Sequence, residues 1–141
     1  MDDLVLKIKQ IDHLVLRALD VEAMMAFYVD VIGCSVEKTQ KETGLYQLRA
    51  GSSLIDLILF DEKTDKTDDV APGKEGRNLD HFCLSIDPFD ADEINRFLKS
   101  KGVDPGIVES RYGAEGFGPS IYLTDPEGNL VELKGPPFSD G

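Results

Sequence analysis

The chain has 141 residues and carries 27 acidic against 15 basic side chains, which gives a formal net charge of −12. Such a surface repels nucleic acid and anionic membranes, so neither is expected as a partner. No apolar run approaches the ~20 residues of a membrane span, and two cysteines are too few for a disulfide framework. We therefore expect one soluble domain, residues 1–141, in the reducing cytoplasm.

Residues 11–60 predict one strand, one helix and three further strands. In residues 11–17 the side chains alternate as in a half-buried strand. Asp20 occupies an N-cap position before residues 21–32, whose apolar side chains keep helical spacing. Breaks that contain glycine then separate three short strands, which we expect near residues 35–40, 45–50 and 53–60.

The second half of the sequence predicts the same order of elements after a connecting loop. Residues 61–78 are almost free of apolar side chains and form the expected loop. A strand over residues 79–86 follows, and then a helix with either Asp90 or Asp92 as its N-cap. Three more strands are expected near residues 106–111, 119–124 and 129–134. Two βαβββ modules are therefore predicted, residues 11–60 and 79–135.

A short repeat supports this duplication. The chain has two histidines, and each follows an apolar residue and an aspartate, in Ile11-Asp12-His13 and in Leu79-Asp80-His81. Strand alternation predicts that each aspartate points away from the face of its histidine. Each module also ends on an apolar strand that holds one acid, Asp56 in the first and Glu132 in the second. We infer a duplicated unit that contributes one imidazole and one carboxylate per copy.

These four side chains indicate a metal site. An unpaired imidazole or carboxylate in an apolar strand is costly, and here the cost recurs at matching positions. If a pseudo-twofold axis relates the modules, His13, Asp56, His81 and Glu132 converge on one concavity. Such donors suit one divalent ion such as Ni, Zn, Co, Fe or Mn, and the lack of thiolates disfavours a closed structural zinc site. The alternative is that the histidines are only hydrogen-bonded and the acids reach solvent.

The same segments resemble the vicinal oxygen chelate superfamily, which includes glyoxalases, fosfomycin-resistance enzymes, epimerases and extradiol dioxygenases. The resemblance spans residues 11–135. It implies an α+β fold in which two βαβββ modules pair into an incomplete, mostly antiparallel β-barrel around a divalent metal. The family's ligand positions fall on His13, His81 and Glu132. Asp56 stands at the variable fourth position, where it is one carbon shorter than the glutamate of glyoxalases. The most specific segments are Asp12 to Leu16, Phe27 to Cys34, Asp80 to Phe82 and Asp125 to Leu133.

Four further positions bear on the substrate. Arg17 matches the arginine with which glyoxalase I binds the glutathione carboxylate, although Phe60 stands where that enzyme has an asparagine; Arg17 could equally be a solvated strand residue. Ser120 and Tyr122 resemble the substrate-binding stretch of the fosfomycin-resistance enzymes, whose basic tail is missing here. Arg111 either lines the mouth of the cavity or lies in an exposed loop.

The resemblance favours a metal-dependent lyase or isomerase of the glyoxalase-like group. Its small substrate would chelate the metal through two vicinal oxygens, while Glu132 or Asp56 moves a proton between adjacent carbons. Three alternatives stay open: a fosfomycin-resistance-type transferase or hydrolase, an extradiol dioxygenase, and a non-catalytic drug-binding protein. The apolar outer strand faces lead us to expect a homodimer, in which the histidines meet within one chain or across two.

Overall fold

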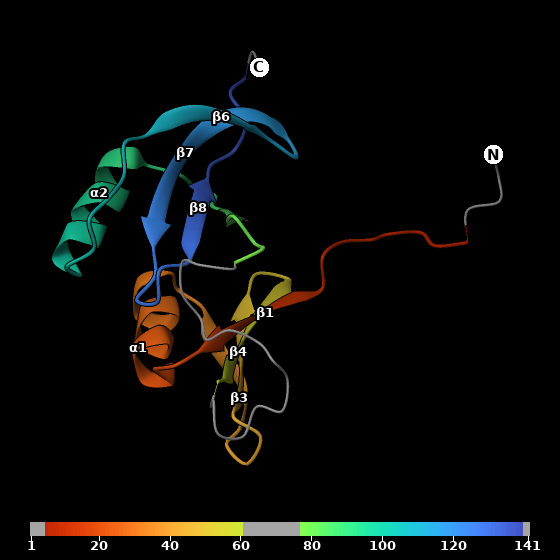
Figure 1. Ribbon diagram of the computed structural model, residues 1–141. Coiled ribbons are helices and arrows are strands. Elements are labelled where there is room, and N and C mark those ends of the chain that lie inside the picture. The colour runs from red at the N-terminus through yellow and green to blue at the C-terminus, as the bar shows by residue number, and fades with distance from the viewer. Residues whose placement is uncertain (1–4, 61–76, 140–141) are drawn as a thin grey trace. The chain divides into compact units, whose positions relative to one another are not determined.

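Each half of the sequence forms a four-stranded mixed sheet (Figure 1). The computed structural model describes residues 5–60 and 77–139, so the loop predicted for residues 61–78 lies almost wholly outside the described residues. The chain divides into two compact units, residues 1–61 and 62–141. The first unit contains β1 (His13–Ala18), α1 (Val21–Ala26), the π-helical turn η1 (Phe27–Val31), β2 (Ser35–Gln40), β3 (Leu45–Ala50) and β4 (Ser53–Leu59). The second contains β5 (Phe82–Ser85), α2 (Ala91–Ser100), β6 (Glu109–Gly113), β7 (Gly116–Thr124) and β8 (Leu130–Lys134).

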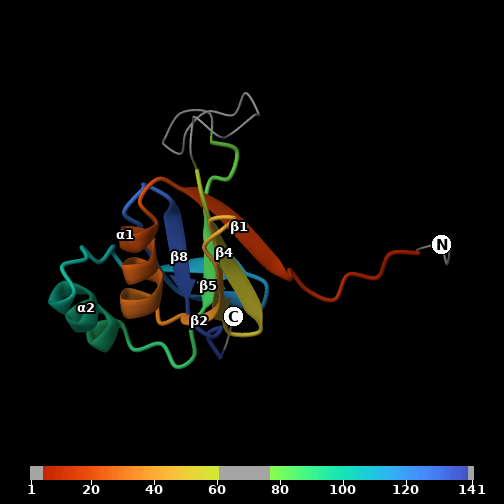
Figure 2. The same ribbon diagram turned by 90° about the horizontal axis from the view of Figure 1, so that it is seen from below.

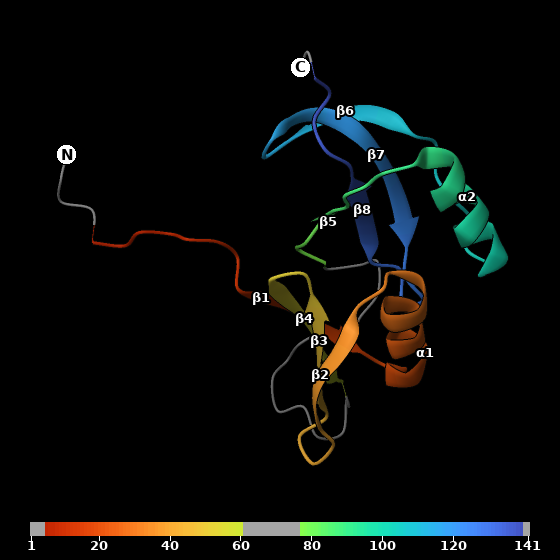
Figure 3. The same cartoon turned by 180° about the vertical axis from the view of Figure 1, so that it is seen from behind.

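The two sheets share one topology. The first has the strand order β1-β4-β3-β2 and the second β5-β8-β7-β6. In each sheet the first pair is parallel and the other two pairs are antiparallel. Figure 3 shows β2, β3 and β4 side by side in the first unit. The predicted α+β fold of two βαβββ modules with mostly antiparallel, unclosed sheets is confirmed. That the modules form a single domain stays a prediction.

The parallel strand pairs, β1–β4 in the first module and β5–β8 in the second, set the same register between the histidine and the acid of each module. Asp56 on β4 lies opposite the residue two positions after His13 on β1. The two strands are labelled in Figure 2. Glu132 on β8 lies opposite the residue two positions after His81. Residues that pair across neighbouring strands share a sheet face, and so do residues two positions apart along one strand. Each histidine therefore lies on the same face as the acid of its module.

In each sheet, the face opposite the histidine supplies most of the core. In β1 the side chains of Leu16 and Ala18 are buried, whereas those of His13, Val15 and Arg17 are exposed. The same alternation holds in β5, where Phe82 is buried and the next residue is exposed. The two histidines therefore lie on the face opposite this core, together with the buried acids Asp56 and Glu132. The buried apolar residues are Leu16, Ala18, Met24, Phe27, Tyr28, Cys34, Leu48, Ile55, Leu57, Phe60, Phe82, Leu98, Ile121, Leu123, Val131 and Leu133.

The first helix is shorter than predicted and ends in a wider turn. The sequence indicated a helix over residues 21–32, but α1 ends at Ala26 and η1 continues it with a hydrogen bond from Ile32 N to Phe27 O of 3.0 Å. The wider turn coincides with the burial of two consecutive aromatic side chains, Phe27 and Tyr28, whose rings meet edge-on at 5.1 Å. Tertiary packing thus overrides the regular helical period here.

Two strands of the second unit begin later than predicted, and the open choice between two N-caps of α2 is decided. The strand expected over 79–86 begins at Phe82, because its first ladder partner on β8 is Val131. The strand expected near 106–111 begins at Glu109 and continues into a tight hairpin with β7. For α2, the N-cap is Asp90, whose carboxylate accepts from Glu93 N at 3.1 Å.

None of the helices in the described ranges combines the length and the apolar character that a membrane crossing requires.

Candidate functional site

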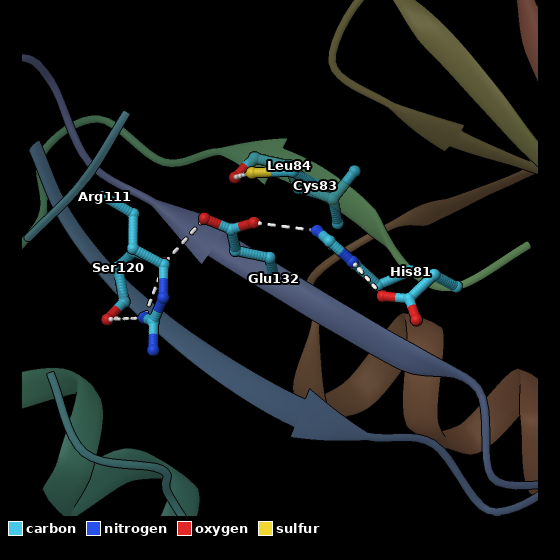
Figure 4. Close-up of polar contacts among 7 residues, drawn as sticks. His81, Cys83, Leu84, Arg111, Ser120 and Glu132 are labelled. Carbon is cyan, nitrogen blue, oxygen red and sulfur yellow. Dashed lines mark hydrogen bonds and ion pairs between the residues drawn. The ribbon is translucent and has the colours of Figure 1, made fainter. Parts of the chain in front are cut away.

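His81 and Glu132 meet on one face of the second sheet (Figure 4). His81 immediately precedes β5, and Glu132 is the middle residue of the neighbouring strand β8. The Nε2 atom of His81 lies 3.1 Å from Oε1 of Glu132. Glu132 is only 6% exposed, so little water competes for this contact. The second unit thus brings together the imidazole and the carboxylate of its repeat.

Ser120 and Arg111 hold the other side of Glu132. The fully buried hydroxyl of Ser120 donates to Oε2 of Glu132 at 2.7 Å. Arg111 Nη1 in turn donates to the backbone oxygen of Ser120 at 3.0 Å and lies 3.1 Å from its hydroxyl. The other guanidinium branch, Nη2, donates to Glu109 Oε2 at 2.9 Å. This chain of contacts fixes the Glu132 carboxylate with one oxygen turned toward His81.

Tyr122 lies opposite Glu132 in the β7–β8 ladder. Its ring meets the His81 ring edge-on with centroids 5.2 Å apart, and the Arg111 guanidinium carbon lies 4.4 Å from the Tyr122 ring centroid. Burial, with the nearby Glu132 charge, raises the pKa of Tyr122 above its ordinary value, while Arg111 acts in the opposite direction. The phenol therefore stays protonated at neutral pH and keeps a hydrogen to donate.

Each histidine is held by the aspartate that precedes it. Nδ1 of His13 lies 2.7 Å from Asp12 Oδ2, and Nδ1 of His81 lies 2.8 Å from Asp80 Oδ2. A carboxylate accepts the hydrogen on Nδ1, which leaves Nε2 with the lone pair that binds metals. Strand alternation predicted that these aspartates point away, and this is wrong because neither belongs to a strand.

The first unit places His13 and Asp56 on one face of its sheet. The hydrogen bond to Asp12, and beyond it the charge of Asp56, raises the pKa of His13 above its ordinary value despite some desolvation. Asp56 is 3% exposed, and its Oδ2 accepts from Gln47 Nε2 at 3.3 Å. Its Oδ1 is buried and has no hydrogen-bond partner in the described part of the chain. An unpaired buried carboxylate oxygen is costly unless a cation or a donor reaches it.

The donors of the second unit fit a divalent cation. Two atoms bound side by side to one ion at about 2.1 Å lie about 3 Å apart, which agrees with the 3.1 Å between His81 Nε2 and Glu132 Oε1. In the tautomer whose Nδ1–H donates to Asp80, His81 Nε2 and Glu132 Oε1 are both acceptors, so a cation between them replaces repulsion with attraction.

Within residues 5–60 and 77–139, no three His, Cys, Asp or Glu side chains gather closely enough to make a metal site. Each unit by itself supplies one imidazole and one acid. The structure places His13 with Asp56 in the first unit and His81 with Glu132 in the second. That all four bind one ion stays a prediction.

The two cysteines are protonated at neutral pH in the absence of a metal. Burial raises the pKa of the Cys34 thiol to about 11. Burial likewise raises the pKa of the Cys83 thiol to about 11, with Glu132 adding to the effect and Lys134 opposing it. Both side chains are free thiols. A protonated thiol is a poor metal ligand and a poor nucleophile.

The residues predicted to bind substrate occupy two places. Arg111, Ser120 and Tyr122 surround Glu132 in the second unit, and Arg111 lies within β6 rather than in a loop. Arg17 lies on the His13 face of the first sheet, with its guanidinium carbon 5.5 Å from the centroid of the Phe60 ring.

One charged residue near Glu132, Lys134, was given no role from the sequence. Lys134 is 6% exposed and lies two positions after Glu132 on β8, so the two side chains share a sheet face. The spacing of two within a predicted strand was the available signal.

The sequence model of the glyoxalase/bleomycin resistance protein/dioxygenase superfamily matches residues 10–133. The chain belongs to this superfamily. The resemblance drawn from the Asp-His repeat and the final acid-bearing strand is thereby confirmed. Members of the superfamily include dioxygenases and fosfomycin-resistance proteins.

Several known proteins are similar to this chain over most of its length. A virulence protein from Salmonella typhimurium is 31% identical over 131 residues, which are 89% of this chain and 83% of the relative. Biphenyl-2,3-diol 1,2-dioxygenase 3 from Rhodococcus globerulus is 27% identical over 86% of this chain, but the match spans only 60% of that enzyme. The solved structure of an integron cassette protein from V. cholerae gives a TM-score of 0.74 at 27% identity, covering 94% of this chain and 98% of that protein.

A fosfomycin-resistance protein from Listeria monocytogenes shares the fold, with a TM-score of 0.64 at 20% identity and coverage of 92% of this chain and 94% of that protein.

Proposed function

We propose that the protein is a divalent-metal-dependent enzyme of the glyoxalase-like group, a lyase or isomerase that acts on a small substrate with two vicinal oxygens. One observation carries the proposal: His81 Nε2 and Glu132 Oε1 face each other at 3.1 Å. The far atom of each group is already engaged, Nδ1 by Asp80 and Oε2 by Ser120. Both remaining lone pairs are therefore directed at one place, as in metal sites with ordered outer ligands.

His81 and Glu132, with His13 and Asp56 from the first unit, are the residues that would hold the ion. Imidazole and carboxylate donors suit Ni, Zn, Co, Fe or Mn. When bound, such an ion supplies a positive charge that stabilises an oxyanion developing on the substrate. Asp56 supports the proposal because its buried Oδ1 lacks a partner among the described residues.

The chain's own side chains supply the proton chemistry. A carboxylate at this face takes a proton from one carbon of the substrate and returns it to the next, the role proposed for Glu132 or Asp56. Tyr122, protonated beside His81, donates a hydrogen bond to a substrate oxygen. Arg111 positions the Glu132 face through Ser120, and Arg17 lies on the corresponding face of the first unit.

Metal analysis of protein purified without chelator tests the proposal. We expect about one divalent ion per chain in the native protein, and loss of that ion in His81→Ala and in Glu132→Gln. Glu115→Gln, in the turn between β6 and β7, removes an exposed acid of the same unit and serves as the matched control. A panel of hemithioacetals, epoxides, catechols and acyl-CoA epimers then identifies the reaction. Full activity of metal-free protein, or normal metal content in His81→Ala, contradicts the proposal.

An extradiol dioxygenase is the second candidate, because the chain is 27% identical to biphenyl-2,3-diol 1,2-dioxygenase 3 over 86% of its length. That reading predicts iron dependence and oxygen uptake with catechols. A fosfomycin-resistance-type reaction is supported by shared fold alone. A drug-binding protein without catalysis would bind its ligand equally well after metal removal.

We also propose a cytoplasmic homodimer. The segment before β1 exposes four large apolar side chains, each at least 75% accessible, as expected of a surface that another chain covers. The two free thiols agree with a reducing compartment. Light scattering of the purified chain measures the oligomeric state. The four side chains are Val5, Leu6, Ile8 and Ile11.

A further inference from the structure

Lys134 is a buried cation on the face of the second sheet that carries Glu132. It is the last residue of β8 and only 6% exposed. Its ladder partners are Ser85 on β5 and Ser120 on β7, which place it in the middle of the sheet rather than at an edge. The charges of Glu132 and Lys134 both act on the thiol of Cys83, because Glu132 raises its pKa and Lys134 lowers it. Lys134 and Glu132 therefore act on one small region of the sheet.

The ammonium of Lys134 has no hydrogen bond or ion pair with any described residue. A buried cation without a partner opposes folding, since it loses hydration and gains nothing in return. The amine is nevertheless not sealed from solvent: in the described ranges the fully enclosed side-chain polar atoms without partners are Asp56 Oδ1 and Asn95 Oδ1. A ligand from solvent can thus reach the unpaired ammonium of Lys134.

Two glycines of the β6–β7 hairpin make room for this side chain. A Cβ atom at Gly113 would stand 2.9 Å from both Cδ and Cε of Lys134. A Cβ atom at Gly118 would stand 2.7 and 2.9 Å from the backbone oxygens of Pro136 and Gly135, and 3.1 Å from the ammonium nitrogen of Lys134. An ordinary side chain at Gly113 would press on the lysine stem, and one at Gly118 would press on the backbone of residues 135 and 136 as well as on the ammonium.

The remaining charges on this face decide which anion fits. Strands β5 to β8 carry two basic side chains, Arg111 and Lys134. Arg111 is already engaged by Glu109, by Ser120 and by the ring of Tyr122. One cation then remains for a ligand, which matches a singly charged carboxylate; a phosphate dianion calls for a second.

We propose that the Lys134 ammonium, framed by Gly113 and Gly118, binds a carboxylate group of the substrate. The proposal rests on the proposed function, because it assumes that the Glu132 face is where the substrate lies. The substrate then carries a carboxylate in addition to its two vicinal oxygens. An alternative is a structural lysine, whose stem fills the space beside the glycines and whose ammonium serves no ligand.

Thermal unfolding of chelator-treated protein separates these readings. Pyruvate is the probe, hydroxyacetone its uncharged counterpart, and sodium chloride and sodium phosphate the ionic controls at equal ionic strength. We expect pyruvate to raise the unfolding midpoint of the native protein above the effect of chloride and phosphate, and hydroxyacetone to have no effect. Lys134→Met is expected to unfold at a higher midpoint than the native protein without ligand. Its apparent affinity for pyruvate falls by about tenfold or more.

Two further variants complete the test. Lys99→Met removes an exposed lysine on α2 and is expected to respond to pyruvate as the native protein does. Lys134→Gln keeps a polar end and replaces Lys134→Met if that variant does not fold. An unchanged pyruvate response in the Lys134 variants overturns the proposal. So does a native protein that responds no more to pyruvate than to chloride or hydroxyacetone, or that responds more strongly to phosphate. Because no metal is present, these results do not depend on whether the metal proposal holds.

Discussion

Ser120 Oγ donates a 2.7 Å hydrogen bond to Oε2 of Glu132, across the β7–β8 ladder. The first module has no counterpart to this bond, because the matching position on β3 is Leu45. There Gln47 holds Oδ2 of Asp56 at 3.3 Å, and Oδ1 is left without a partner among the described residues. The two acids of the duplicated unit therefore differ, since the carboxylate of the second module is fixed through both oxygens.

Replacing Ser120 with Ala tests this support. The change leaves Oε2 of Glu132 buried without its donor, so we expect the free energy of unfolding to fall by about 1–3 kcal/mol. Metal affinity is expected to fall by about tenfold or more, as for other outer-shell partners. Chemical denaturation and metal titration measure the two effects. Ser85→Ala, an exposed serine on β5, is the matched control and should behave as the native protein. Native behaviour of Ser120→Ala would show that Glu132 does not depend on this hydroxyl.

The charges around Cys83 predict its reactivity. With a thiol pKa of about 11, only about one thiolate in ten thousand is present at neutral pH, so alkylation by iodoacetamide is slow although the residue as a whole is exposed and only its thiol is partly buried. Glu132→Gln removes a charge that raises this pKa and should speed alkylation a few-fold. Lys134→Met removes a charge that lowers it and should slow alkylation. Mass spectrometry in a Cys34→Ser background measures the rates. Equal rates in the three proteins would mean that burial alone controls this thiol.

The sequence predicts the order of the elements and the position of the repeat, because alternation, capping residues and glycines are local signals. It does not predict where ladders begin. His81 lies just before β5, since pairing with β8 starts at Phe82, a tertiary fact. The wide turn at Phe27 likewise follows from packing rather than from helical propensity. Asp12 and Asp80 were assigned by alternation although they precede their strands, and so their bonds to the histidines were missed.

The N-cap of α2 gives a stability prediction. From the sequence alone, either of two aspartates could be this N-cap. Asp90 accepts the hydrogen bond from Glu93 N, whereas Asp92 lies in the first turn. Asp90→Ala should lower the free energy of unfolding by about 1 kcal/mol, and Asp92→Ala should cost less. Urea denaturation of the two variants measures the difference. An equal loss in both would indicate that the cap contributes no more than the charge at the helix start.

The raised pKa of His13 predicts a pH dependence in the metal-free protein. The bond to Asp12 is the largest cause, so Asp12→Asn should move the pKa of His13 down toward about 6.5. A raised pKa means that the pair contributes its full stability below the unfolded value, and that this contribution is lost as pH rises through the folded value. Proton NMR of the imidazole follows the titration directly, and two histidines are simple to assign. Asp80→Asn is the control and should leave the His13 titration unchanged.

Mixing two inactive variants decides whether the site is formed within one chain or across a dimer. His13→Ala and His81→Ala each remove one ligand of the proposed set, so neither should retain metal alone. If each site takes His13 from one protomer and His81 from its partner, a mixed dimer has one site that lacks both histidines and one site that is intact. After unfolding and refolding together, random pairing gives mixed dimers in half of the population, so metal content should return to about a quarter of the native value.

If both histidines of a site come from the same chain, every site in the mixture lacks one ligand and no metal returns. The double variant His13→Ala/His81→Ala, refolded with native protein, provides the reference. A dimer of one native and one double-variant chain keeps one intact ligand set when each site lies within a chain. It keeps none when each site lies across two chains. Counting native homodimers, this second mixture should hold about half of the native metal content when sites lie within a chain and about a quarter when they lie across two chains. Metal recovery in the first mixture together with half of the native content in the second would contradict a site that needs both imidazoles.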